Sequence, residues 1–270
     1  MLAQGHVHVW EASLEVPVDT LTAYECLLSD DERDRAANFR FSHDSVAFVV
    51  ARGTLRALLS LYVGVRPQEL IFRYGEHGKP GLAHPTAPLI PEFNLSHSDN
   101  KAIVAFSATK RVGVDIERIR PIGDMISLMS QCFNQHEIAE VLAAGEAATP
   151  VFFRWWSRRE AYMKGLGIGL SLSTDDFFIS TGSTIRPMSI HNIGMPWESS
   201  SWSLRDISIH GFSGTIAVDA LDWTMSNFVW HHPSSRDNMR FRSDAKNNPS
   251  SDVNCLRRGL VSYDRYDEGL

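Results

Sequence analysis

The chain contains a short apolar stretch interrupted by two carboxylates, Arg111-Val112-Gly113-Val114-Asp115-Ile116-Glu117. In an extended strand successive side chains point to opposite faces, so Asp115 and Glu117 would share one face while Val114 and Ile116 occupy the other. Two carboxylates on one face repel each other unless a positive charge lies between them, and Mg²⁺ prefers such oxygen ligands. The stretch therefore predicts either a magnesium site or the solvated face of an edge strand.

Strands and helices are predicted on both sides of this stretch. The apolar segment 102–106 ends shortly before it, so we predict that the two pair as a hairpin. A second hairpin is predicted for 202–209 and 215–218, around Gly211 and Gly214. The other predicted strands are 6–10, 70–74 and 177–179, and the predicted helices are 20–28, 43–62, one that begins at Asn134, and 150–164.

The composition indicates a globular protein, because 43% of the 270 residues are hydrophobic and 21% are charged. A net charge of -6 argues against a general nucleic-acid binder, which would carry a basic excess. Cys26, Cys132 and Cys255 are widely spaced, so neither a disulfide framework nor a zinc site is expected. No signal peptide and no apolar run of about 18 residues are evident, so we expect a cytoplasmic protein outside the membrane.

Several cations and a histidine precede the carboxylates. Arg52 and Arg56 are four residues apart on a predicted helix and share a face, where they either receive an anion or remain ordinary solvated arginines. Lys79 lies in a glycine-rich turn, which either permits a close backbone approach to a ligand or is a plain surface turn. His97, between Ser96 and Ser98, is either an anion contact or an exposed loop histidine.

The predicted helix 150–164 carries an acid and a base on one face. Trp156, Glu160 and Lys164 are spaced by four residues, so they line up along the helix. An exposed Glu–Lys pair is the simple interpretation, but five aromatic residues surround the pair and indicate that the helix is largely buried. Anion-binding cations, a divalent metal on carboxylates and a buried acid–lysine pair are together the equipment of phosphate-transfer chemistry.

Three motifs occur in a fixed order along the chain. They are Phe93-Asn94-Leu95-Ser96-His97-Ser98, then Gly113-Val114-Asp115-Ile116-Glu117, then Trp156-Ser157-Arg158-Arg159-Glu160-Ala161-Tyr162-Met163-Lys164. In this order and at these separations the motifs resemble the 4'-phosphopantetheinyl transferases of the large, Sfp-like type. The turn 77–80 and the arginine-bearing segment 39–59 resemble the same family, and the similarity spans about residues 6–225.

This resemblance implies an α+β fold of two similar α/β halves related by a pseudo-twofold axis, with coenzyme A in the cleft between them. We accordingly expect an N-terminal half at 1–108, a C-terminal half at 109–230 with the metal and catalytic residues, and a polar, disordered tail at 231–270. The implied reaction transfers 4'-phosphopantetheine from coenzyme A to a serine of an apo acyl or peptidyl carrier protein, releasing adenosine 3',5'-bisphosphate. A monomer that binds neither nucleic acid nor membrane is expected.

The resemblance also implies roles for single residues. Asp115, Glu117 and Glu160 match the family's Mg²⁺ ligands. Glu160 also matches the proposed general base, and Lys164 matches the lysine that stabilises or protonates the leaving phosphate. Ser96 and His97 match contacts to the phosphates of the coenzyme, and Lys79 and Arg52 match positions near its adenosine phosphate.

One residue departs from the family pattern. Arg159 stands where the family usually has lysine before the metal-binding glutamate, and arginine keeps the charge but not the geometry, so a phosphate or substrate contact would change.

Two other functions remain open at this point. One is a Mg²⁺-dependent hydrolase of a pyrophosphate-containing nucleotide, and the other is a non-catalytic module that binds coenzyme A.

Overall fold

The computed structural model describes residues 2–83, 90–169, 172–181, 188–194, 198, 201–233 and 263–266. The strands are β1 (His6–Ser13), β2 (Phe72–Tyr74), β3 (Pro80–Leu82), β4 (Glu92–Ser98), β5 (Lys101–Ser107), β6 (Val112–Arg118), β7 (Phe177–Ser180), β8 (Met188–Asn192), β9 (Ser203–Asp206), β10 (Phe212–Val218), β11 (Thr224–Trp230) and β12 (Tyr263–Tyr266). The helices are α1 (Val18–Glu25), α2 (Asp30–Ala37), α3 (Ser42–Val63), α4 (Met125–Cys132), α5 (Gln135–Ala143) and α6 (Ala148–Leu166), with short 3₁₀ turns η1 (Pro67–Glu69) and η2 (Gly145–Ala147). This mixture confirms the α+β class, and the pseudo-twofold relation stays a prediction.

The first sheet has the strand order β12-β11-β1-β5-β4, and β2 and β3 form a separate hairpin. β1 is antiparallel to β5 but parallel to β11, so a strand from the second half of the chain lies beside the first strand. Helix α3 covers one face of this sheet, where Leu55 and Leu59 join Trp10, Val104 and Phe106 in one apolar cluster.

The second sheet has the order β6-β10-β9-β8-β7. β9 and β10 are antiparallel neighbours, which confirms the predicted hairpin around Gly211 and Gly214. Helix α6 covers one face of the sheet, because Tyr162 and Phe153 cluster with Trp202 and Ala217.

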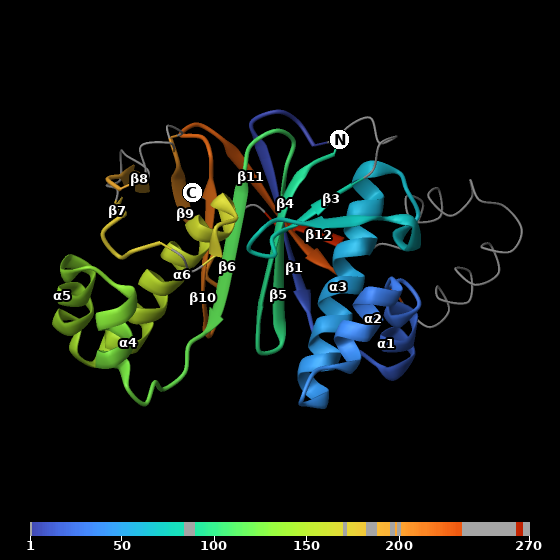
Figure 1. Cartoon of the computed structure of the whole chain (residues 1–270), viewed down its shortest axis with the longest axis horizontal. Helices are drawn as coiled ribbons and strands as arrows, with labels where there is room; N and C mark the ends of the chain where they lie inside the picture. The colour runs from blue at the N-terminus through green and yellow to red at the C-terminus, as the bar shows by residue number, and fades with distance from the viewer. Residues whose placement is uncertain are drawn as a thin grey trace, which may run out of the picture.

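The two sheets share a third apolar cluster between them. Val9 and Ile103 of the first sheet meet Val114, Ile116 and Ile216 of the second, and these residues are almost completely excluded from solvent. Side chains alternate across each strand, so the remaining positions of the same strands face the helices. The result is a four-layer arrangement in which α1–α3 lie outside one sheet and α4–α6 outside the other (Figure 1).

The predicted hairpin between 102–106 and 111–117 is wrong. Both edges of β5 are already paired, with β1 on one side and β4 on the other. β6 instead pairs with β10 and forms the edge of the second sheet, where side chains of β4 contact its free backbone edge. The chain therefore crosses from one sheet to the other between Ser107 and Val112.

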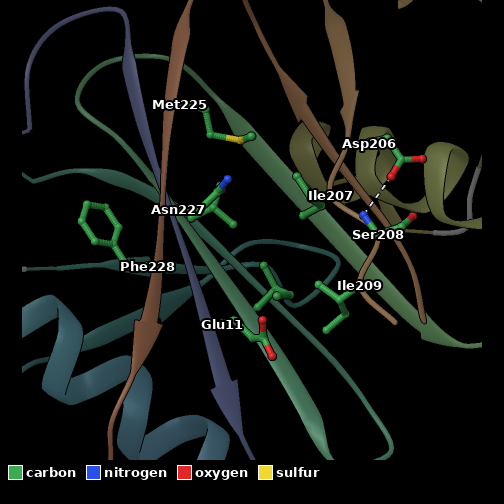
Figure 2. Close-up of a pocket in the computed structure, with 10 residues that line it drawn as sticks. Glu11, Asp206, Ile207, Ser208, Ile209, Met225, Asn227 and Phe228 are labelled. Atoms are coloured by element: carbon green, nitrogen blue, oxygen red, sulfur yellow. Dashed lines mark hydrogen bonds between the residues drawn. The ribbon is translucent and has the colours of Figure 1, made fainter. Parts of the chain in front are cut away.

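A small cavity lies between the first sheet and the segment 206–209. Its lining includes Glu11 of β1, Asn227 of β11 and the segment 206–209, as Figure 2 shows. The volume of about 20 Å³ is room for roughly one water molecule, so the cavity is far too small for a coenzyme.

The strands cross the boundary that was predicted between the halves at 108/109. β11 belongs by sequence to the second half but completes the first sheet. Residues 263–266, inside the segment predicted to be a disordered tail, form β12 against β11. His232 also packs inward, because its ring hydrogen-bonds to Tyr24 OH at 2.7 Å and to Ser13 O at 2.8 Å. The rest of the tail prediction lies outside the described residues.

Among the described helices, only α3 has the length and hydropathy of a membrane span. However, 78% of its most apolar window is buried inside the protein. We therefore interpret α3 as the core helix of the first sheet.

Candidate active site

β6 presents its two carboxylates on the face opposite the shared core. Val114 and Ile116 point into that core, and alternation turns Asp115 and Glu117 the other way. Asp115 is only 1% exposed. Its Oδ1 accepts a hydrogen bond from Ser96 Oγ at 3.0 Å, whereas its buried Oδ2 has no hydrogen-bond partner among the described residues. The strand and its two faces are thus as predicted.

Glycine at position 113 lets α6 pass very close to β6. A Cβ added to Gly113 would lie 2.0 Å from Ala161 O and 2.3 Å from Gly165 N, so no other residue fits without moving the backbone. This close approach brings Lys164 to the carboxylates. Its Nζ lies 2.5 Å from Asp115 Oδ1 and 2.9 Å from Ser96 Oγ.

Glu160 lies one helical turn before Lys164, and the charges of both β6 carboxylates affect its pKa. The pKa of Glu160 is raised to about 7, chiefly by desolvation; the Lys164 charge opposes this rise, and the charges of Asp115 and Glu117 add to it. The pKa of Glu117 is also raised, first by desolvation and then by Asp115. The site thus holds three carboxylates within electrostatic range of one another and one ammonium among them.

No three His, Cys, Asp or Glu side chains in the described part of the chain stand close enough to hold a metal ion in their present positions. The Lys164 ammonium contacts Asp115 instead. The donor set still fits a hard divalent cation. Its ligands are oxygens, Oδ2 of Asp115 lacks a partner among the described residues, and desolvation together with mutual repulsion raises the pKa of Glu160 and Glu117.

Two of the predicted coenzyme contacts lie near these carboxylates. Ser96 is in the site itself, and its neighbour His97 is exposed, with a pKa that desolvation and the Lys164 charge lower. Lys79 lies at the end of α6, where its Nζ donates to Gly165 O at 2.8 Å and to Val112 O at 3.2 Å. Burial lowers the pKa of Lys79 to about 8.

Arg52 and Arg56 share a face of α3, but they have different surroundings. Arg56 is 1% exposed and donates to Glu32 Oε2, Ser29 Oγ and two backbone carbonyl groups, so it is a core residue and neither an anion contact nor a solvated arginine. Arg52 pairs with Glu32 and donates to Tyr74 OH at 3.0 Å, while its buried Nη1 has no described partner. An open hollow of about 390 Å³ is lined nearby by Glu32, Tyr74, Asp31, Arg35, His77 and Gly78.

Arg159 does not reach the carboxylates. It is 4% exposed and points toward α5, where its Nη1 donates to both oxygens of Glu137, at 3.0 and 3.1 Å. Its Nη2 donates to Thr174 O, and the guanidinium lies over the ring of Phe177. The described contacts of Arg159 are thus internal to the protein, and an altered phosphate or substrate contact at this residue stays a prediction.

Sequence reasoning missed two residues that border the site. Asn94 and Ser98 lie two residues on either side of Ser96 on β4, and all three hydrogen-bond to the free edge of β6. The available signal was the alternation of polar residues at 94, 96 and 98, with Phe93 before them and Leu95 between them.

Comparisons with known proteins identify the class to which this fold and site belong. A family model described as the 4'-phosphopantetheinyl transferase superfamily matches residues 111–217, and one described as 4'-phosphopantetheinyl transferase, N-terminal, matches residues 10–109. The chain therefore belongs to the 4'-phosphopantetheinyl transferase superfamily, as the three motifs indicated.

Individual relatives agree with this assignment. The chain is 37% identical over 172 residues to the 4'-phosphopantetheinyl transferase HetI of Nostoc sp., an alignment that covers 63% of this chain and 72% of the relative. It is 30% identical to a putative 4'-phosphopantetheinyl transferase of Synechocystis sp., over 60% of this chain and 65% of that one. Identity to the 4'-phosphopantetheinyl transferase Sfp of Bacillus subtilis is 28%, over 56% of this chain and 66% of Sfp. The matches thus span about two thirds of each relative, and they disfavour the hydrolase and the non-catalytic module.

Proposed function

We propose that this enzyme transfers 4'-phosphopantetheine from coenzyme A to a serine of an apo acyl or peptidyl carrier protein. The serine oxygen forms a bond to the β-phosphorus of coenzyme A, the bond from that phosphorus to the bridging oxygen breaks, and adenosine 3',5'-bisphosphate leaves. The observation that carries this proposal is the partly buried cluster of Asp115, Glu117, Glu160 and Lys164, in a chain that belongs to the transferase superfamily.

Asp115, Glu117 and Glu160 are the residues that would hold Mg²⁺. When bound, the ion supplies positive charge that neutralises the pyrophosphate during transfer. The support is the excess of carboxylates over cations, together with the unpartnered Oδ2 of Asp115.

Glu160 is the candidate general base for the serine hydroxyl. A base acts best when its pKa lies near the working pH, and the pKa of Glu160 is about 7 because the side chain is desolvated among like charges. The proton of the attacking serine passes to this carboxylate.

Lys164 is the candidate donor to the leaving phosphate. An ammonium has three N–H donors, and its contacts with Asp115 and Ser96 use two of them. The remaining donor is available for an oxygen of the departing bisphosphate. The hydrogen bond from Lys164 to Asp115 also holds the amine at the carboxylate cluster.

Ser96, His97, Lys79 and Arg52 are proposed to contact the phosphates of coenzyme A. Ser96 and His97 are next to Lys164, which favours the pyrophosphate for this pair. The unpartnered Nη1 of Arg52 and the hollow beside Tyr74 favour the adenosine end. Lys79 lies between these regions and is held at the end of α6.

The carrier protein is the macromolecular partner in this proposal. We further propose that the enzyme acts in the cytoplasm as a monomer, without nucleic acid or membrane. Sedimentation of the purified protein with and without coenzyme A tests the oligomeric state, and a stable dimer would contradict it.

A transfer assay with intact-mass detection tests the proposed reaction. The full chain is incubated with coenzyme A, Mg²⁺ and several apo carriers, each carrier is weighed, and the small molecules are analysed for hydrolysis. We expect a phosphopantetheine adduct on a carrier and an equal amount of adenosine 3',5'-bisphosphate. Coenzyme A cleavage without a carrier would indicate the hydrolase, and binding without turnover would indicate the non-catalytic module. Glu11→Gln serves as a control, because Glu11 lines the small cavity beside the segment 206–209 and pairs with Lys101 rather than with a proposed site residue (Figure 2).

A further inference from the structure

The backbone N–H groups on the free edge of β6 donate hydrogen bonds to side chains rather than to another strand. An edge strand carries backbone N–H groups that need acceptors, and every second one in β6 points away from β10. Side chains of β4 accept them at matching two-residue intervals. The pairs are Val114 N with Asn94 Oδ1 at 2.9 Å, Ile116 N with Ser96 Oγ at 3.3 Å, and Arg118 N with Ser98 Oγ at 3.1 Å.

These backbone contacts fix where the proton of each serine hydroxyl must go. The backbone N–H of Arg118 can only donate, so Ser98 Oγ accepts there and keeps its single proton for another partner. That partner is Glu117 Oε2, at 2.9 Å. A carboxylate that accepts from a fixed hydroxyl has less freedom to rotate, so the β4 edge orients Glu117.

The same argument about the hydroxyl proton applies to Ser96 but not to Asn94. Ser96 Oγ accepts from Ile116 N and from Lys164 Nζ, so its proton goes to Asp115 Oδ1. Asn94 is buried, accepts from Val114 N and has no described contact with a carboxylate. The three residues therefore close the same edge, but only the two serines also hold site carboxylates.

We propose that Ser98 is a positioning residue that aims Glu117 at the metal, an inference that rests on the proposed magnesium site. Mg²⁺ demands near-ideal geometry from its ligands, and groups that hydrogen-bond to metal ligands typically change metal affinity by about 10- to 100-fold. Ser98 acts through Glu117 and has no described contact with Lys164 or Glu160.

The test measures metal binding without turnover. Mg²⁺ is titrated calorimetrically into the full chain saturated with coenzyme A, with no carrier present. We expect Ser98→Ala to bind Mg²⁺ about tenfold more weakly, and Ser98→Thr, which keeps the hydroxyl, to recover most of that loss. In the transfer assay the Mg²⁺ concentration for half-maximal rate should rise by a similar factor in Ser98→Ala, while kcat at saturating Mg²⁺ falls less.

Asn94→Ala is the matched control, because it removes the same type of edge contact at the other end of the row. It should lower the melting temperature and leave the Mg²⁺ affinity of the folded protein unchanged. Equal Mg²⁺ affinity in Ser98→Ala and wild type, or equal losses in Ser98→Ala and Asn94→Ala, would overturn the inference while wild-type transfer continues. If wild type neither binds Mg²⁺ nor modifies any carrier, the proposed function fails and this inference fails with it.

Discussion

Two charge clusters, one beside each sheet, differ in how well their charges are matched. Beside the first sheet, Glu32 is 2% exposed and pairs with two guanidinium groups, Arg56 at 2.6 Å and Arg52 at 3.3 Å. Beside the second sheet, Asp115 is equally buried but shares its single ammonium, Lys164, with the neighbouring carboxylates.

The difference separates a structural cluster from a reactive one. Around Glu32 cations outnumber the acid, and Arg56 has every contact it needs to remain a core residue. Around Asp115 acids outnumber the cation, and desolvation together with the charges of Asp115 and Glu117 raises the pKa of Glu160 to about 7. A cluster short of positive charge is unfavourable by itself, and it becomes favourable when a cation arrives from outside.

The largest expected effect comes from removing a reactive member of the second cluster. Glu160→Gln removes both a proposed metal ligand and the base, so we expect carrier modification to fall by about 1000-fold. The rate is measured by intact mass over time at saturating Mg²⁺. Arg154→Gln is the control on the same helix, because Arg154 is exposed and outside the site, and it should stay near wild type. Near-normal transfer by Glu160→Gln would reassign the base.

The corresponding substitution in the first cluster should affect stability. Glu32→Gln leaves Arg56 and Arg52 buried without a carboxylate, which should cost about 3 kcal/mol of unfolding free energy. Urea unfolding followed by circular dichroism gives this value. The folded fraction of Glu32→Gln should keep an intact metal site. A stability change below about 0.5 kcal/mol would show that the pair does not behave as a buried ion pair.

Loss of a carboxylate should change the stability of the protein in opposite directions in the two clusters. The pKa of Glu160 is about 7 in the folded chain and is raised above its ordinary value of 4.5, so the folded state binds more protons between these pH values. Stability from this group is therefore lost as pH rises through that window. We expect metal-free Glu160→Gln to melt at a higher temperature than wild type at about pH 8 and at nearly the same temperature near pH 4.5.

Added Mg²⁺ provides a second test of the difference in melting temperature between wild type and Glu160→Gln. With coenzyme A present, added Mg²⁺ should raise the melting temperature of wild type more than that of Glu160→Gln, because the variant has lost a proposed ligand. A variant that is less stable than wild type at about pH 8 without metal would show that Glu160 is not held against like charges.

The smallest effect is expected at Arg159, beside the reactive glutamate. Arg159→Lys restores the usual family residue but loses paired hydrogen bonds to Glu137, so we expect a cost of about 1 kcal/mol and transfer within about threefold of wild type. Thermal melting and the transfer rate check the two parts. A large change in the Michaelis constant for coenzyme A would place Arg159 in substrate binding after all.

Much of the site was predictable from residue type and spacing. The alternation of strand 112–118 placed Asp115 and Glu117 on one face, and the four-residue spacing placed Glu160 and Lys164 together on α6. The hairpin partner of β6 was not predictable in this way, because a short apolar strand pairs with whichever edge the rest of the sheet leaves open. The burial of Arg56 was equally hidden, since its acceptors include Glu32 and carbonyl groups from other segments.

The sequence by itself determined the family, the α+β class and the chemical groups available for phosphate transfer, because these follow from local motifs and their order. Only the tertiary structure decided which charged groups are neutralised. Asp115 meets Lys164 because Gly113 lets a helix approach the strand, and Ser98 meets Glu117 because two sheet edges run side by side. Such contacts depend on distances between segments far apart along the chain, and local patterns do not encode these distances.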